Sequence, residues 1–252
     1  MRRIIIIGTV LAAFGGGAAA LAAADANTYG GSISFSPTKA GSAHKPIPIG
    51  WKQTITAKSN QAGLNAAPLK DIKTTIYGLT VDTKLLPTCS NSKIESSGGT
   101  GCPSKSLVAT GTVQSQLGPP SRQGPTVACD PILHVYNGGK NYVWEFFIVP
   151  NEQACPAQTG SATPYKGKFT RSGKNLILNV PLPPDVSTDA GGLGLDASLV
   201  HEQLNWKKVT KKVKGKTVGY FATVGCKAHK RPFKVKYTDT TGSSTITGKA
   251  KC

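Results

Sequence analysis

Residues 132–149 read ILHVYNGGKNYVWEFFIV and contain the clearest hairpin pattern of the chain. Large and β-branched side chains fill its two halves. Residues 137–140, with the sequence NGGK, separate them and are of types that tolerate the positive φ of a tight turn. The pattern predicts a β-hairpin with strands over residues 132–136 and 142–149. Cys129 and Cys155 flank this hairpin.

Period-two alternation extends through most of the chain after residue 26, whereas the i, i+3, i+4 spacing of an amphipathic helix is hardly found. Short strands separated by turn residues predict an all-β fold, which we expect to be an antiparallel β-sandwich of the immunoglobulin-like or jelly-roll-like kind. Residues 197–209 fit either a strand or a short helix, and we expect a strand. Further strands are predicted over residues 32–35, 51–57, 72–81, 107–113, 176–180, 216–226, 233–238 and 244–251.

The first 26 residues have the pattern of a secretory signal peptide. Arg2 and Arg3 precede an apolar run over residues 4–21, and Ala24 and Ala26 then form a small-residue A-x-A site. The run is nearly long enough to span a bilayer, so an uncleaved signal anchor is the alternative. We expect cleavage after Ala26. This leaves residues 27–252 as a single secreted domain without an integral membrane segment, extracellular or associated with the cell wall.

The six cysteines of an exported chain are expected to form disulfides, because export brings them into an oxidising compartment. Sequential pairing would close three local loops, and alternation turns the last two cysteines inward. No two cysteines have the C-x-x-C spacing of a structural zinc site, so we expect no metal. Fifteen pairings of six cysteines are possible and the sequence leaves the connectivity open; the sequential pairing that the spacing favours joins Cys89 with Cys102, Cys129 with Cys155, and Cys226 with Cys252.

Basic residues dominate the composition, with 30 Lys and Arg against 12 Asp and Glu and a formal net charge of +18. Charge of this size predicts anionic partners and says nothing about the fold. Residues 205–237 contain no acidic side chain, and a turn over residues 239–242 would pair residues 233–238 with 243–248 and direct the lysines to solvent. The candidate binding residues of this basic sheet face are Lys230, Arg231, Lys234, Lys236, Lys249 and Lys251.

The basic face has two interpretations. Lysines cover many solvated sheets and protect their edges from aggregation, which needs no partner. Alternatively, the face holds the protein on an anionic cell-wall polymer or polysaccharide by an attraction that salt would screen. Lysine lacks the bidentate fork of arginine, so such binding would be unspecific. No nucleic-acid-binding motif is found, and nucleic acid is not an expected partner.

Acidic residues gather between positions 185 and 202, where they could supply a carboxylate pair, although the spacing matches no calcium loop. The sequence contains no G-x-S-x-G, H-E-x-x-H or phosphate-binding glycine motif. We therefore expect no catalytic residue and no cofactor, and a non-enzymatic structural or adhesive protein. The alternative is a secreted carbohydrate-active hydrolase that uses this segment, whose candidate residues are Asp185, Asp189, Asp196, His201 and Glu202.

Tryptophans would suit a sugar-binding surface only if they are exposed. We assign Trp144 to the core because it lies in an apolar strand, whereas Trp51 follows a proline-containing loop and remains a candidate.

Two short signatures resemble uncharacterised secreted proteins of actinobacteria. The first is LPTC at residues 86–89, followed by GCP at residues 101–103 and VATG at residues 108–111. The second is VGY at residues 218–220, followed by VGC at residues 224–226. The resemblance extends loosely over residues 85–252. It implies secretion and a β fold, and it carries over no site residue, because the group has no established activity.

Overall fold

A computed structural model describes residues 27–156 and 163–252; the predicted signal peptide and its cleavage site lie outside them. The expected all-β, antiparallel fold is confirmed. Twelve strands form the main sheet: β1 (Thr28–Ser36), β3 (Gly50–Lys58), β4 (Leu69–Tyr77), β6 (Leu107–Gly118), β7 (Val127–Cys129), β8 (Ile132–Gly139), β9 (Tyr142–Ile148), β10 (Tyr165–Ser172), β11 (Asn175–Pro181), β12 (Asp196–Trp206), β16 (Lys230–Asp239) and β17 (Ser243–Lys251).

Two smaller sheets and four short helical elements complete the described structure. One small sheet joins β2 (Ile47–Pro48), β15 (Phe221–Thr223) and β5 (Leu79–Val81), and the other joins β13 (Thr210–Val213) to β14 (Lys216–Gly219). The helical elements are α2 (Asn91–Ser97) and the 3-10 turns η1 (Ser104–Ser106), η2 (Pro184–Val186) and η3 (Ala190–Gly192). Within the described residues, none of the helices is both long and apolar enough to cross a membrane.

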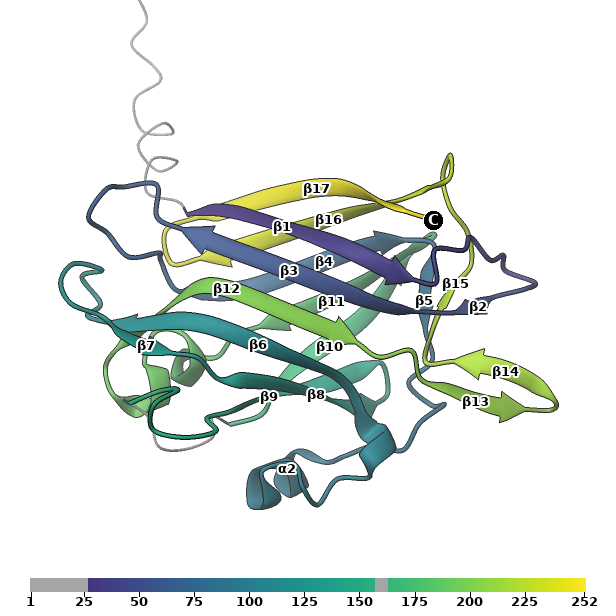
Figure 1. Ribbon diagram of the computed structural model, residues 1–252, viewed down its shortest axis with the longest axis horizontal. Coiled ribbons are helices and arrows are strands. Elements are labelled where there is room, and N and C mark those ends of the chain that lie inside the picture. The colour runs from purple at the N-terminus through teal and green to yellow at the C-terminus, as the bar shows by residue number, and fades with distance from the viewer. Residues whose placement is uncertain (1–26, 157–162) are drawn as a thin grey trace, which may run out of the picture.

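The main sheet curls into a nearly closed, barrel-like shape. Its strands follow one path, β1-β3-β12-β6-β8-β9-β10-β11-β4-β16-β17, with β7 beside β6. The two ends of this path, β1 and β17, lie side by side (Figure 1). This order differs from the expected sandwich, in which two separate sheets face each other. The reason is that β12 is hydrogen-bonded to both β3 and β6, and β8 to both β6 and β9, so no break divides the strands into two sheets.

The β8–β9 hairpin has the predicted strands but a different turn. Lys140 and Asn141 adopt the positive φ angles of 47° and 63°, whereas Asn137 lies inside β8 and is fully buried. Its amide nitrogen donates hydrogen bonds of 3.0, 3.2 and 3.2 Å to three backbone carbonyls of residues 83–87. The Tyr220 hydroxyl donates to its amide oxygen at 3.2 Å. Asn137 is therefore a buried link between three segments, not a turn residue.

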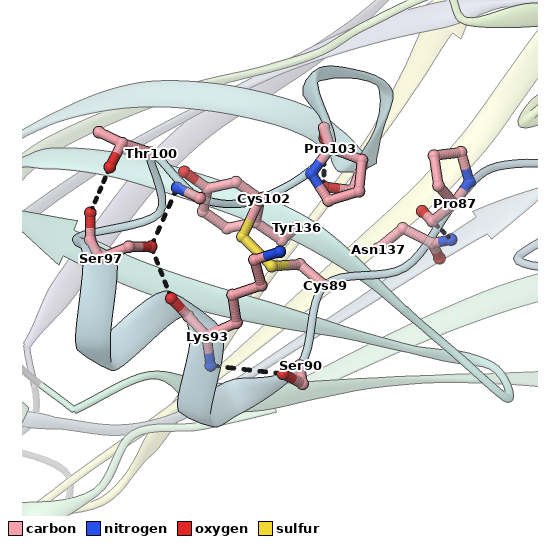
Figure 2. The surroundings of a disulfide bond; sticks show 12 residues. Pro87, Cys89, Ser90, Lys93, Ser97, Thr100, Cys102, Pro103, Tyr136 and Asn137 are labelled. Carbon is pink, nitrogen blue, oxygen red and sulfur yellow. Dashed lines mark hydrogen bonds between the residues drawn. A yellow bond between two sulfur atoms is a disulfide. The ribbon is translucent and has the colours of Figure 1, made fainter.

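Helix α2 and one disulfide lie over the outer face of β8 and β9 (Figure 2). Ser90 caps the helix, since its hydroxyl accepts a hydrogen bond of 3.3 Å from a backbone N–H of the first turn. The bond between Cys89 and Cys102 closes the segment beside Tyr136 of β8. Gly99 has a φ of 82°, and a Cβ there would lie 2.1 Å from the Tyr136 hydroxyl, so glycine permits this close approach. The helix was not predicted, because its seven residues bury a single apolar side chain, Ile94, and are too few to show a helical period.

The sequential disulfide pairing is confirmed for all six cysteines. Besides the bond at helix α2, the structure contains the bonds Cys129–Cys155 and Cys226–Cys252. The last bond joins the segment after β15 to the C-terminal end of β17, with a Cα separation of 6.4 Å. Each bond thus holds together strands or loops that are close in sequence.

The ambiguous segment after residue 196 is a strand, as predicted, and β12 lies between β3 and β6. Strand β10 was not predicted. Its inward-facing residues are Tyr165, Gly167 and Phe169, and the glycine among them weakens the apolar alternation with the lysines. The position of β10 between β9 and β11 completes the wall that faces β12 across the interior.

An aromatic cluster fills part of the interior. Trp51 stacks on Trp206 with ring centroids 5.1 Å apart, and Phe221 packs edge-on against both. Trp51 is 4% exposed, which removes it as a candidate for an exposed sugar-binding surface. Trp144 is half-buried on the outer face of β9, beside the cluster under α2, and does not lie in the main core.

Candidate functional site

The outer face of β16 and β17 has the predicted register. Lys234 and Lys236 each lie opposite a threonine of β17, and both are exposed. Lys249 and Lys251 extend the same face, since residues two apart on a strand point to the same side. Lys230 is exposed and lies directly opposite Lys251.

The lysines continue across the sheet beyond this hairpin. Lys73 of β4 lies opposite Lys236, Asn179 of β11 lies opposite Lys73, and Lys168 of β10 lies opposite Asn179. Directly opposed residues of antiparallel strands point to the same side, so these side chains form one row across four neighbouring strands. We define the outer lysine face as Lys73, Lys168, Lys230, Lys234, Lys236, Lys249 and Lys251.

The outer lysine face contains two like-charge pairs at directly opposed positions, Lys236 with Lys73 and Lys230 with Lys251. Such pairs destabilise an isolated sheet. Asp71 lies on the same face and its carboxylate accepts a hydrogen bond of 2.9 Å from Asn179. Burial raises the pKa of Asp71, while the same hydrogen bond and the charges of Lys73 and Lys236 act to lower it.

The structure contradicts the placement of Arg231 on this face. Arg231 is in phase with the inward-facing Val235 and is fully buried. Its guanidinium carbon lies 4.4 Å from the centroid of the Phe35 ring, and one nitrogen donates to the Thr223 hydroxyl. The other two guanidinium nitrogens have no hydrogen-bond partner among the described residues. Burial lowers the pKa of Arg231 to about 10. Arg231 belongs to the interior and is removed from the candidate binding set.

A cavity lies inside the barrel-like sheet and offers about 90 Å³ to the centres of water-sized groups. By this measure one water needs about 10 to 15 Å³, so several atoms of a ligand fit. The connection from β11 to β12 covers part of the cavity with Val186 and Ala190, and Trp206 contributes to its wall. The walls are mainly aliphatic and include Leu69, Ile72, Leu178, Val180, Leu199 and Leu204.

Three carboxyl groups line this cavity: Glu145 from β9, Glu202 from β12 and Asp185 from η2. No Lys, Arg or His is among the described residues that line it. Glu145 and Glu202 are only 5% and 8% exposed. Tyr165 lies directly opposite Glu145 on the neighbouring strand, and its hydroxyl donates a hydrogen bond to that carboxyl.

Burial controls the ionisation of these groups. Burial, with a smaller contribution from the nearby Glu202, raises the pKa of Glu145 to about 8 against the lowering effect of the hydrogen bond from Tyr165. Burial likewise raises the pKa of Glu202 to about 7. The pKa of Tyr165 is well above its ordinary value for the same reason, and that of Tyr237 is also raised by burial and by the charge of Glu202. Both glutamates therefore change charge near neutral pH.

Glu202 makes no hydrogen bond or ion pair with any residue in the described part of the chain, although it is more than nine-tenths buried. The indole nitrogen of Trp206, another lining residue, is also unpartnered among the described residues. By contrast, Gln53 accepts a hydrogen bond of 3.2 Å from the Thr74 hydroxyl. The cavity thus presents at least one carboxyl whose oxygens are available to a ligand.

The structure brings together only part of the predicted acidic segment. Asp185 and Glu202 reach the cavity, whereas Asp189 is exposed and accepts a hydrogen bond of 2.7 Å from a backbone N–H of its own loop. Asp196 is buried at the start of β12, away from the cavity lining, and His201 alternates to the opposite side from Glu202. Over residues 27–156 and 163–252, no group of three or more His, Cys, Asp and Glu could hold a metal ion.

Glu145 was not predicted as a site residue. The signal in the sequence is a single charge within the apolar run of residues 142–149, in phase with Val143 and Phe147. A carboxyl that alternates with inward-facing apolar residues points into the interior.

Comparison with known proteins assigns nothing further: no protein-family model matches the chain, and no curated protein is significantly similar to it.

Proposed function

We propose that the chain is an exported, non-enzymatic protein that the outer lysine face holds on anionic polymers of the cell envelope. The observation that supports this most directly is that like charges occupy directly opposed positions twice, Lys236 with Lys73 and Lys230 with Lys251. Each pair costs stability in the isolated protein, and a polyanion lying over the face would offset that cost.

The spacing of the lysines favours collective attraction. Neighbouring strands lie about 5 Å apart, so Lys236 and Lys73 are separated by about one strand spacing and Lys73 and Lys168 by about two. One strand spacing is shorter than the Debye length of about 8 Å at physiological salt and two spacings are comparable to it, so neighbouring charges act on a polymer together. Lysine offers a point charge without a planar fork, so the attachment selects for charge density more than for a particular repeat unit. Export is supported by the N-terminal pattern and by the three disulfides.

The test compares two variants of equal charge change. The protein is applied to beads coated with dextran sulfate or with purified cell-wall polymer, and the salt concentration that elutes it is measured. The face variant should elute at clearly lower salt than the native protein, and the control should elute close to it. Equal shifts for both would contradict the proposal, because net charge alone would then govern retention. The face variant replaces Lys234, Lys236, Lys249 and Lys251 with Gln, and the control replaces Lys211, Lys212, Lys214 and Lys216 of the β13–β14 hairpin with Gln.

A second candidate is a secreted carbohydrate-active hydrolase that uses the cavity carboxyls. It is favoured by one observation: Glu145 and Glu202 line the same cavity and the pKa of each is raised toward neutral pH. Carboxyl pairs with altered pKa values serve as acid and base in glycoside hydrolysis. Turnover in a broad glycan screen that disappears in Glu202→Gln would support it, and a screen without turnover by the native protein would reject it.

A further inference from the structure

The interior cavity has the opposite charge character to the rest of the protein. The chain carries 30 basic against 12 acidic residues, yet the charged groups among the described lining residues are three carboxyls. The remaining wall is mostly aliphatic and includes Leu178 from β11 and Leu199 from β12. A ligand that matches this lining combines an apolar body with a positively charged end.

Glu202 supplies the second, independent observation. It is 8% exposed and has no partner among the described residues, so its ionised form is buried without compensation. An uncompensated buried carboxylate destabilises the folded protein, and a cation in direct contact offsets that cost. Glu145 lines the same cavity, so a cation beside Glu202 also lies in the field of the Glu145 carboxyl.

We propose that this cavity binds a primary alkylamine, with the ammonium group between Glu145 and Glu202 and the alkyl chain against the aliphatic walls. An ammonium group carries three N–H donors, which suits the free acceptor oxygens of Glu202. A volume of about 90 Å³ corresponds to roughly six to nine water-sized groups, the size of a chain such as hexylamine. Calcium and magnesium fit the site poorly, because they need six or more oxygen ligands and the surrounding wall is apolar.

This binding site is separate from the outer lysine face and does not depend on the function proposed for that face. The two surfaces also prefer ligands of opposite charge. A cationic amine is repelled by the lysines outside, so its retention by the protein reports on the interior.

Binding of an amine should depend on pH in a defined direction. The groups that face the two glutamates are Tyr165 from β10, Tyr237 from β16 and the carboxyl of Asp185 from η2. The pKa values of both tyrosines are raised, so they stay neutral, and an alkylamine stays protonated up to about pH 10. Between pH 5.5 and 8.5 the glutamates pass from neutral to ionised, so affinity for the amine rises with pH. Binding near pH 7 releases protons from the glutamates.

Isothermal titration calorimetry with hexylamine and 1-hexanol tests the inference. We expect hexylamine to bind about ten-fold or more tightly at pH 8.5 than at pH 5.5, while hexanol shows no such change. At pH 7, the heat of amine binding should vary with the ionisation enthalpy of the buffer because protons are released. Weaker or equal binding of hexylamine relative to hexanol at pH 8.5, or no binding of either, would overturn the proposal.

Three variants locate the binding. Glu202→Gln should remove the preference for the amine and most of the pH dependence while keeping hexanol binding. Leu178→Trp should fill the cavity and weaken both ligands. Asp189→Asn, an exposed carboxyl outside the lining, is the matched control and should behave as the native protein. Amine binding of native strength in both Glu202→Gln and Leu178→Trp would place the amine elsewhere and overturn the assignment.

Discussion

Replacing both cavity glutamates with the isosteric amide, in the variant Glu145→Gln/Glu202→Gln, should make folding stability less dependent on pH between pH 5 and pH 9. The ordinary pKa of each side chain is 4.5, and burial raises that of Glu145 to about 8 and that of Glu202 to about 7. Between these values the native protein binds protons that the unfolded chain has already released. The stabilising contribution is therefore complete below pH 4.5 and is lost as pH rises through about 7 to 8.

The size of the effect follows from the same values. Each pH unit of difference between native and unfolded pKa corresponds to about 1.4 kcal/mol. This gives about 5 kcal/mol for Glu145 and about 3 kcal/mol for Glu202. The repulsion between the two carboxyls is already part of the raised pKa of Glu145, so the contributions of the pair add. We expect the native protein to lose roughly 6 kcal/mol relative to the variant between pH 5 and pH 9, less than the full sum because the unfolded glutamates are already largely ionised at pH 5.

Urea unfolding followed by tryptophan fluorescence, with disulfides intact, measures this difference at each pH. Trp51 and Trp206 are buried and stacked, so their emission should change when the core opens. Subtracting the free energy of unfolding of the variant from that of the native protein removes the contributions of all other titrating groups, including repulsion within the basic surface. Asp189→Asn serves as the control and should follow the native curve.

Parallel pH profiles for the native protein and the double variant would refute the reasoning. That result would mean that Glu145 and Glu202 titrate in the folded protein as they do in the unfolded chain, and that water reaches both carboxyls freely. The opposite slope, with native stability rising relative to the variant at high pH, would mean that a cationic group holds them ionised.

Three further changes test the remaining structural assignments. Asn137→Ala should lower the free energy of unfolding by about 3 kcal/mol or more, since it removes donors to three backbone carbonyls, and chemical denaturation measures this loss. Cys129→Ala/Cys155→Ala opens a loop with a sequence separation of 26 and should cost about 3 to 4 kcal/mol by the same assay. Tyr165→Phe removes the hydrogen bond that lowers the pKa of Glu145, so the carboxyl should titrate at higher pH in an NMR experiment. An unchanged free energy of unfolding would refute the stabilising role of the Asn137 hydrogen bonds or of the disulfide, and an unchanged titration of Glu145 would refute its hydrogen bond from Tyr165.

Local elements were predictable because few alternatives compete over short distances. The four-residue turn over residues 239–242 leaves little freedom in register, and Lys234 and Lys236 lie opposite the threonines expected from it. The three disulfides join neighbouring cysteines, so loop closure favours the pairs that form. The local pattern placed Asn137 in the turn, because asparagine is a common turn residue. The prediction was wrong because the backbone carbonyls that its side chain binds lie about fifty residues earlier in the chain.

The candidate sites were only partly predictable from the sequence, because their residues come from strands that are distant in the chain. The lysines of one hairpin were found, but Lys73 and Lys168 join them only through pairings between distant strands. Glu202 was noted as one member of an acidic segment, whereas Glu145 was overlooked within an apolar strand. Proximity between these two glutamates depends on β9 and β12 facing each other across the interior, which no local pattern encodes.

From the sequence followed most of the strands, the alternation of their two faces, the register of the β16–β17 hairpin and the local disulfides, since all of these depend on neighbouring residues and short loops. Tertiary structure alone decided which strands adjoin, that the sheet curls until β1 meets β17, and that its inward faces enclose an acidic cavity. Alternation indicates on which side of a strand a residue lies. Whether that side is buried in the core or exposed to solvent depends on how the other strands pack against it.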